Sequence, residues 1–186
     1  MDYRSGWIRT HAAMNLPLPD VATLSRLDCP AFVALLGGVY ECSPWIAERA
    51  WQRRPFGDRA ALQQALAQSL AAASKAEQLA LIRVHPELAG KAAVRGELTV
   101  DSRREQAGAG LDRCSPEEFE EIQRLNRDYG QRFGFPFIIA VKGLGRQDIL
   151  AAMRRRIGRT PAEEFAEALA QVDRIAALRL ADLVAA

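Results

Sequence analysis

Residues 74–86 read Ser-Lys-Ala-Glu-Gln-Leu-Ala-Leu-Ile-Arg-Val-His-Pro, which is a helix with both of its ends marked in the sequence. Ser74 and Glu77 form a capping box, in which each residue can satisfy a backbone N–H group at the start of the helix. Pro86 disfavours helical backbone at the residue before it. The helix is therefore predicted to stop here and to leave the imidazole of His85 at its end.

The same kind of start signal recurs along the chain. Two more capping boxes stand at residues 115–118 (Ser-Pro-Glu-Glu) and 160–163 (Thr-Pro-Ala-Glu), and further N-cap residues precede helical stretches at Asp28, Ser43 and Asp58. There are no alternating Val, Ile and Thr patterns of the kind that indicate strands. The sequence therefore predicts an all-α fold, a single-domain helical bundle over residues 21–186.

One stretch near residues 135–142 does not fit a helix. It reads Phe-Pro-Phe-Ile-Ile-Ala-Val-Lys, in which Pro136 and two β-branched isoleucines argue against helical backbone. A segment this apolar must be buried and extended, and its N–H and C=O groups then need partners. Either side chains or water satisfy this backbone inside the core, or some of its amides face a cavity and bind a polar ligand.

Composition excludes several classes of protein. The chain has 186 residues, of which 49% are hydrophobic, and this suits one domain with a sizeable core. The formal net charge is +2 and only Arg154-Arg155-Arg156 cluster, so no nucleic-acid partner is predicted. No apolar run approaches the roughly 20 residues of a membrane helix, so no membrane partner is predicted either.

The N-terminus and the cysteines favour a cytoplasmic protein. Residues 1–20 form a polar lead-in, expected to be flexible, without the apolar stretch of a signal peptide, and Met14 within it is a candidate natural start. Cys29, Cys42 and Cys114 are odd in number and widely spaced, as expected of free thiols in a reducing compartment.

Metals and nucleotide cofactors are not predicted. His85 is the one histidine outside the lead-in, and no Cys-x-x-Cys pair or glycine-rich phosphate-binding motif occurs. Cys114 and His85 could form a nucleophile pair, but nothing in the sequence places them together. A structural thiol is therefore the preferred interpretation of Cys114.

A polar face follows the histidine. Ser102, Glu105 and Gln106 fall at i, i+3 and i+4 of a predicted helix and therefore share one side of it. Either Ser102 is the N-cap and Glu105 turns back onto it, or Thr99 is the cap and this face is available for function.

Arg179 interrupts the apolar stripe of the last predicted helix. The stripe has helical spacing and consists of Phe165, Leu169, Val172, Ala176, Arg179 and Leu183. A buried guanidinium needs an anion with good geometry. Three interpretations stay open: Arg179 reaches the rim, pairs with an internal carboxylate such as Glu105, or binds an anionic substrate.

Three motifs, in order, resemble the OHCU decarboxylase family. They are His-Pro-Glu-Leu-Ala-Gly at 85–90, Ser-x-x-Glu-Gln-x-Gly-x-Gly-Leu at 102–111, and Asn-x-x-Tyr-x-x-x-Phe-Gly-Phe-Pro-Phe at 126–137. The resemblance implies an all-α, often dimeric enzyme without metal or organic cofactor. It would decarboxylate 2-oxo-4-hydroxy-4-carboxy-5-ureidoimidazoline to (S)-allantoin, the last step from urate.

Carried over to this sequence, the resemblance implies a catalytic pair of His85 and Glu105, with Arg179 as the third charged member. The implied substrate contacts are Pro86, Ser102 and Gln106, together with the backbone of Phe137, Ile138, Ile139, Ala140 and Val141. The expected partners are the anionic ureidoimidazoline substrate and a second copy of the chain in a homodimer.

The implied chemistry agrees with these residue types. Loss of CO2 leaves an electron pair that the conjugated C=N system of the substrate ring can accept, so no cofactor is needed as an electron sink. Histidine, whose ordinary pKa is about 6.5, suits the proton of the hydroxyl beside the departing carboxylate, and Glu105 would orient the imidazole or share that proton. Arg179 is expected to position the substrate or to hold Glu105, because tight pairing with the departing carboxylate would stabilise the ground state.

Two other functions stay open at this point. A helical domain could bind a urate-derived ligand without turnover, or the chain could decarboxylate a related heterocyclic acid.

Overall fold

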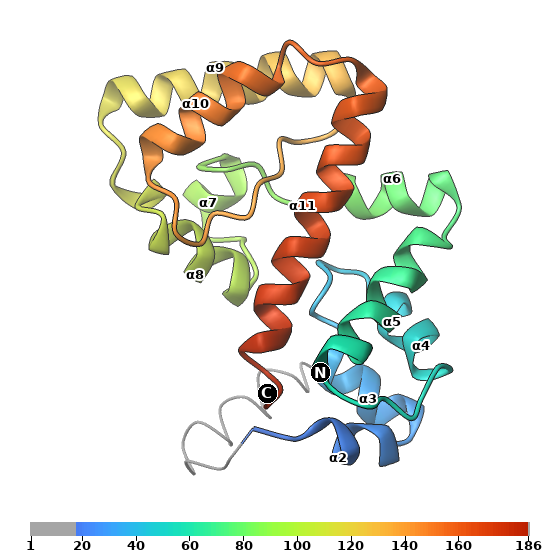
Figure 1. Cartoon of the computed structure of the whole chain (residues 1–186). Coiled ribbons are helices and arrows are strands. Elements are labelled where there is room, and N and C mark those ends of the chain that lie inside the picture. The colour runs from blue at the N-terminus through green and yellow to red at the C-terminus, as the bar shows by residue number, and fades with distance from the viewer. Residues whose placement is uncertain (1–17, 186) are drawn as a thin grey trace. The chain divides into compact units, whose positions relative to one another are not determined.

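The computed structural model describes residues 18–185. Over these residues the chain forms ten α-helices and one 3-10 turn, with no strand (Figure 1). The prediction of an all-α fold is therefore confirmed. The predictions made for the lead-in, including Met14 as a natural start, concern residues that lie outside the described part, apart from residues 18–20.

The chain divides into two compact units. Unit 1 holds the described residues up to Leu81 and from Ile175 onward, and unit 2 is Ile82–Arg174. Unit 1 contains α2 (Val21–Arg26), α3 (Cys29–Leu36), α4 (Pro44–Trp51), α5 (Arg59–Ala71) and most of α6 (Lys75–Arg83). Unit 2 contains α7 (Lys91–Arg95), α8 (Val100–Gly108), η1 (Leu111–Arg113), α9 (Pro116–Phe133), α10 (Arg146–Arg156) and most of α11 (Pro161–Ala181).

Helices begin at the predicted positions in both units, although the Ser43 side chain makes no capping hydrogen bond at the start of α4. The carboxylates of Asp28 and Asp58 accept hydrogen bonds from backbone N–H groups in the first turns of α3 and α5. Reciprocal capping boxes begin α6 at Ser74, α9 at Ser115 and α11 at Thr160. Each box satisfies two N–H groups that the helix itself leaves unpaired, which fixes where these helices begin.

The sequence patterns do not predict α2, α7 or α10. A glycine precedes both α7 and α10, so neither helix has a side chain at its N-cap to mark it. The third, α2, is capped by Asp20 and begins directly after the polar lead-in, in a stretch to which no helix is assigned. None of the helices in residues 18–185 is long and apolar enough to span a membrane.

Within unit 1, α4 packs against both α3 and α5. The ring of Phe32 stacks on that of Phe56 with the centroids 5.9 Å apart. The indole N–H of Trp51 donates to the carbonyl of Leu27 at 2.9 Å, which connects the end of α4 to the turn after α2.

Within unit 2, Tyr129 is the centre of an aromatic cluster. Its ring lies 4.5 Å from that of Phe133, 6.0 Å from Phe135 and 5.3 Å from Phe137, centroid to centroid. Aromatic pairs at such distances contribute about 0.5–1.5 kcal/mol each beyond the area that they bury. The cluster therefore attaches the end of α9 to the backbone that follows it.

That backbone is the extended segment, by which we mean residues 136–141. It forms neither helix nor strand, and Phe137 and Ile138 are buried, as predicted for residues 135–142. The helix before it ends at Gly134, whose φ of +75° lies in the left-handed region that glycine adopts without strain.

Candidate active site

The histidine predicted to be catalytic lies in unit 2, directly after α6. The helix ends at Arg83, and the backbone N–H of His85 donates to the carbonyl of Ile82 at 3.3 Å. Only 8% of His85 is exposed. The predicted position of the imidazole at the end of a helix is confirmed.

Residues 85–90, the His85 loop, are held from α8 by Gln106. The carbonyl oxygen of this side chain accepts a hydrogen bond from the N–H of Ala89 at 2.9 Å. Its NH2 group donates to the carbonyl of Glu87 at 3.4 Å. The Gln106 side chain therefore bridges the loop, a role that its prediction as a substrate contact does not include.

Two further carboxamides reach the same loop from α9. Asn126 donates to the carbonyl of Leu88 at 2.9 Å, and Gln123 donates to the carbonyl of Ala89 at 2.7 Å. Together with Gln106, they give three successive carbonyl groups of the loop a side-chain donor each. We call Gln106, Gln123 and Asn126 the carboxamide clamp.

The clamp holds a backbone that is locally strained. Ala89 has a φ of +48°, in the left-handed region that residues with a Cβ rarely adopt. Such a conformation costs on the order of 1–3 kcal/mol and persists where its surroundings determine it. A Cβ at Gly90 would lie 2.6 Å from the Cβ of Glu87, so this position requires glycine. The conformation after His85 is therefore specified by both the clamp and the sequence.

The polar face of α8 is arranged as the second of the two alternatives expected. Thr99 is the N-cap, and its hydroxyl accepts from the N–H of Ser102 at 3.3 Å. Ser102 is thus a residue of the helix and not its cap. Ser102 and Gln106 are buried on α8, and Glu105 is half-buried.

Arg179 lies in unit 1 and is buried, with 4% of its side chain exposed. Its Nη1 atom lies 2.7 Å from a carboxylate oxygen of Glu41, which is 3% exposed. The interpretation that Arg179 reaches the rim is therefore wrong, because a guanidinium at this depth requires an anion and has one. Its predicted interactions with Glu105 and with substrate stay predictions.

Cys114 behaves as a structural thiol. Its Sγ atom donates to the carbonyl of Leu111 at 3.4 Å, and burial raises its pKa. A nucleophilic cysteine needs the opposite shift, because the thiolate is the reactive form. Cys29, Cys42 and Cys114 are all free thiols, as predicted.

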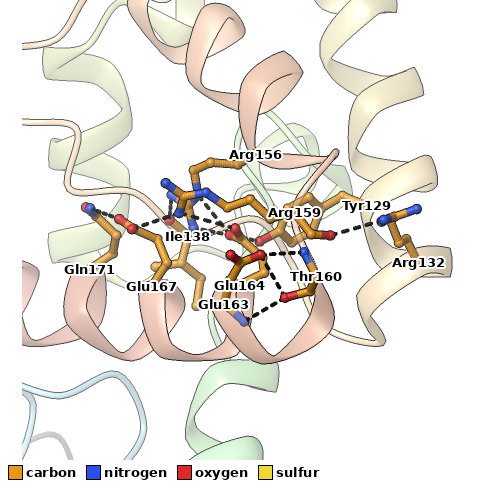
Figure 2. Close-up of polar contacts among 10 residues, drawn as sticks. All are labelled: Tyr129, Arg132, Ile138, Arg156, Arg159, Thr160, Glu163, Glu164, Glu167 and Gln171. Atoms are coloured by element: carbon orange, nitrogen blue, oxygen red, sulfur yellow. Dashed lines mark hydrogen bonds and ion pairs between the residues drawn. The ribbon is translucent and has the colours of Figure 1, made fainter.

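The extended segment is satisfied by side chains at two points, Ile138 and Ala140. The guanidinium of Arg156 donates to the carbonyl of Ile138 at 2.8 Å (Figure 2), and the N–H of Ala140 donates to the side-chain oxygen of Gln171 at 2.9 Å. At these two groups, the interpretation of a core connection satisfied by side chains is confirmed.

Arg156 in turn belongs to a buried polar network. Its Nε atom donates to Glu164 at 2.8 Å, and the hydroxyl of Tyr129 donates to the same carboxylate. Only 2% of the Arg156 side chain and 0% of that of Glu164 are exposed. Burial, and then the hydrogen bond to Glu164, raise the pKa of Tyr129. Tyr129 is therefore a hydroxyl donor throughout the physiological range.

The residues that hold the His85 loop and the extended segment have no role predicted from the sequence, apart from Gln106. For Asn126, the only indication of a role in the sequence is its place in the motif at residues 126–137. Glu164 has another indication: it lies four residues before the buried Ala168, so helical spacing puts a carboxylate on the inward face of α11. No local pattern points to Glu41 as the partner of Arg179.

The family model of OHCU decarboxylase matches residues 25–181 of the chain. Over 163 residues the sequence is 46% identical to the 2-oxo-4-hydroxy-4-carboxy-5-ureidoimidazoline decarboxylase of Halalkalicoccus jeotgali, a match that covers 88% of this chain and 90% of that protein. This chain belongs to the OHCU decarboxylase family. By family it is a carboxy-lyase, and the prediction of a decarboxylase of urate degradation is confirmed.

The chain also matches part of two longer proteins. The uric acid degradation bifunctional protein of Bacillus subtilis is 41% identical over 161 residues, which cover 87% of this chain and 32% of that one. A crystal structure of (S)-allantoin synthase superposes with a TM-score of 0.72 at 28% identity, covering 89% of this chain and 54% of that chain.

Proposed function

We propose that this protein decarboxylates 2-oxo-4-hydroxy-4-carboxy-5-ureidoimidazoline to a single enantiomer, (S)-allantoin. Membership of the family supports the reaction, and the similarity to an (S)-allantoin synthase supports the enantiomer. The structural observation that carries the proposal is the His85 loop, in which three carboxamides fix the backbone directly after a buried histidine. A proton-transfer group must be held in place to act from one face of a substrate.

In this proposal His85 takes the proton of the hydroxyl beside the departing carboxylate. The bond to CO2 breaks, and the electron pair left on that carbon enters the conjugated C=N system of the ring. Glu105 orients the imidazole or shares its proton. The carbon that lost CO2 keeps the hydroxyl oxygen and becomes a ring carbonyl. Return of the proton from one face to the neighbouring ring carbon, which bears the ureido group, gives the single enantiomer. No metal or organic cofactor takes part.

The proposed substrate contacts are polar groups that α8 and the extended segment provide. Ser102 and Gln106 are buried one turn apart on α8, and Pro86 follows the catalytic histidine. These side chains, with backbone groups of residues 137–141, would bind the ureido and ring carbonyl groups. Arg179 would position the anionic substrate, for which its two-pronged guanidinium is suited.

Arg179→Lys tests that role, because it keeps the charge and removes the fork. We expect a kcat/KM at least about tenfold lower. An unchanged kcat/KM would show that the fork takes no part in recognition.

We also propose that the protein is a homodimer, as the family resemblance implies, and that it is cytoplasmic, as its free cysteines indicate. Light scattering of the purified chain distinguishes a dimer from a monomer directly. A monomer that retains full activity would contradict this part of the proposal.

The proposed reaction is tested by adding the purified protein to freshly generated substrate and following allantoin by circular dichroism. Spontaneous decay of the substrate gives racemic allantoin, so the ellipticity reports the catalysed reaction. We expect a strong signal of the (S) enantiomer that is absent without protein. Binding of allantoin without enantiomeric enrichment would instead indicate a ligand-binding domain.

A further inference from the structure

The extended segment is held on one of its two sides. In extended backbone, the N–H and C=O groups of one residue point to one side and those of the next residue to the other. The bound groups belong to Ile138 and Ala140, which are two residues apart and therefore share a side. By this alternation, Ile139 lies between them and presents its N–H and C=O to the opposite side. Its backbone N–H donates to no other residue in the described range 18–185.

The carboxamide of Gln171 is fixed in one orientation by a carboxylate. Its NH2 group donates to Glu167 at 2.8 Å (Figure 2), and its oxygen accepts from the N–H of Ala140 at 2.9 Å. Because a carboxylate only accepts hydrogen bonds, the amide cannot turn over without losing both contacts. Glu167 is itself held by Arg159 at 2.9 Å, and hydrogen bonds from Gln171 and then Arg159 keep its pKa low.

The guanidinium of Arg156 is fixed from two sides as well. Its Cζ atom lies over the ring of Phe137, 4.4 Å from the centroid, while Glu164 accepts a hydrogen bond from its Nε atom at 2.8 Å. One nitrogen, Nη1, then donates to the carbonyl of Ile138 at 2.8 Å. A planar fork that is held in this way sets the direction of the carbonyl as well as its position.

We infer that Gln171 and Arg156 are positioning residues of the decarboxylase: they orient the backbone of Ile138 and Ala140 so that the N–H and C=O of Ile139 face the substrate. This inference rests on the proposed function, which assigns substrate contacts to residues 137–141 as a group. It assigns different roles within these residues. The carbonyl of Ile138 and the N–H of Ala140 are hydrogen-bonded to protein side chains, and the backbone groups of Ile139 bind the polar groups of the substrate.

A reciprocal exchange of two residues tests the inference. In Gln171→Glu two carboxylates face each other at positions 167 and 171, so the side chain turns away and the N–H of Ala140 loses its acceptor. We expect KM for the ureidoimidazoline to rise about tenfold, with a smaller change in kcat, since one hydrogen bond of this kind is worth about a factor of ten. In the double variant Glu167→Gln/Gln171→Glu, the donor and the acceptor exchange places. KM should return to within about twofold of the wild type.

Glu163→Gln is the matched control. It makes the same Glu-to-Gln substitution as at position 167 but one turn earlier on α11, where Glu163 contacts Thr160. We expect no change in KM. If Gln171→Glu does not fold, Glu167→Lys puts a donor opposite Gln171 from a position with 29% of its side chain exposed, and KM should again rise.

The outcomes separate the inference from the proposed function. A wild-type protein that leaves the substrate unconverted overturns the proposed function. Normal turnover by the wild type, with KM in folded Gln171→Glu or in Glu167→Lys within about twofold of it, overturns the positioning role alone. A double variant no better than Gln171→Glu also overturns it.

Discussion

The His85 loop and the extended segment are two non-helical backbones of unit 2, and they are held by different chemistry. The clamp on the loop consists of neutral carboxamides that each donate to a carbonyl. The segment is held by a buried ion pair, Arg156–Glu164, and by a carboxamide that a carboxylate orients. Neutral donors satisfy a carbonyl without burying a charge. An ion pair fixes geometry more rigidly but makes each partner indispensable to the other.

The largest effect is therefore expected where one charge of the pair is removed. Glu164→Ala leaves the guanidinium of Arg156 buried without its carboxylate and should lower the free energy of unfolding by about 3–5 kcal/mol. Urea unfolding at neutral pH measures it. Glu163→Ala, on the same helix but exposed, should cost no more than about 1 kcal/mol. Equal losses in the two variants would show that burial of the pair is unimportant.

Removing both charges sharpens this result. Arg156→Met with Glu164→Leu fills the same space with apolar side chains, and such exchanges are often neutral for stability. The double variant should therefore be much more stable than Glu164→Ala alone. Since the carbonyl of Ile138 then lacks its donor, KM should still rise. A double variant as unstable as the single one would contradict the assignment of the loss to an unpaired charge.

A smaller effect is expected in the loop. Asn126→Ala leaves the carbonyl of Leu88 buried without a donor, which should cost about 1–3 kcal/mol. The Oδ1 atom of Asn126 has no hydrogen-bond partner among the described residues, so the hydrogen bond that is lost is the one donated by its NH2 group. We expect kcat to fall as the loop after His85 loosens. Urea unfolding measures the loss of stability, and initial rates measure kcat. An unchanged kcat would contradict the claim that the clamp positions His85 for catalysis.

Gln123 should matter less than Asn126, because it is only half-buried. Gln123→Leu removes the donor to the carbonyl of Ala89 and should cost about 0.5–1.5 kcal/mol. The control is Gln131→Leu, which makes the same change at an exposed position of α9. Thermal unfolding should separate the two variants, and a loss at Gln131 as large as that at Gln123 would count against the clamp.

The smallest effect concerns pH. The neutral clamp does not titrate, but the capping box of the helix before the loop does. A hydrogen bond from the Ser74 hydroxyl, followed by one from Arg49, lowers the pKa of Glu77 from 4.5 to about 2. Because the folded state holds this pKa down, the stabilisation is present above pH 4.5 and is lost as the pH falls toward 2.

Glu77→Gln should therefore lose less stability than the wild type between these pH values. Unfolding midpoints measured across this range check the prediction. A steeper acid dependence in the variant would contradict the sign.

Local signals explain how much of this fold the sequence predicts. Capping boxes at Ser74, Ser115 and Thr160 act within four residues, so they mark α6, α9 and α11 correctly. Pro136 likewise marks the extended segment. The choice between Thr99 and Ser102 as the cap of α8 stays open in the sequence, because both offer the hydroxyl that a cap requires.

Partners far apart in the chain leave no such signal. The position of Arg179 in an apolar stripe predicts that it has an anionic partner. The sequence does not identify that partner, because Glu41 is 138 residues away. The sequence does not predict the donors of the clamp either. A glutamine on a helix surface is usually solvated, and only the tertiary structure brings Gln123 to the carbonyl of Ala89. The sequence therefore predicts the two non-helical backbones, the His85 loop and the extended segment. It does not predict the side chains that hydrogen-bond to them.

His85→Ala tests the central claim most directly, with allantoin followed by circular dichroism from freshly generated substrate. The wild type should produce the (S) enantiomer. His85→Ala, if it unfolds at a temperature close to that of the wild type, should give only racemic product at the spontaneous rate. Formation of (S)-allantoin by His85→Ala at a near-normal rate would contradict the assignment of His85 as the group that moves the proton.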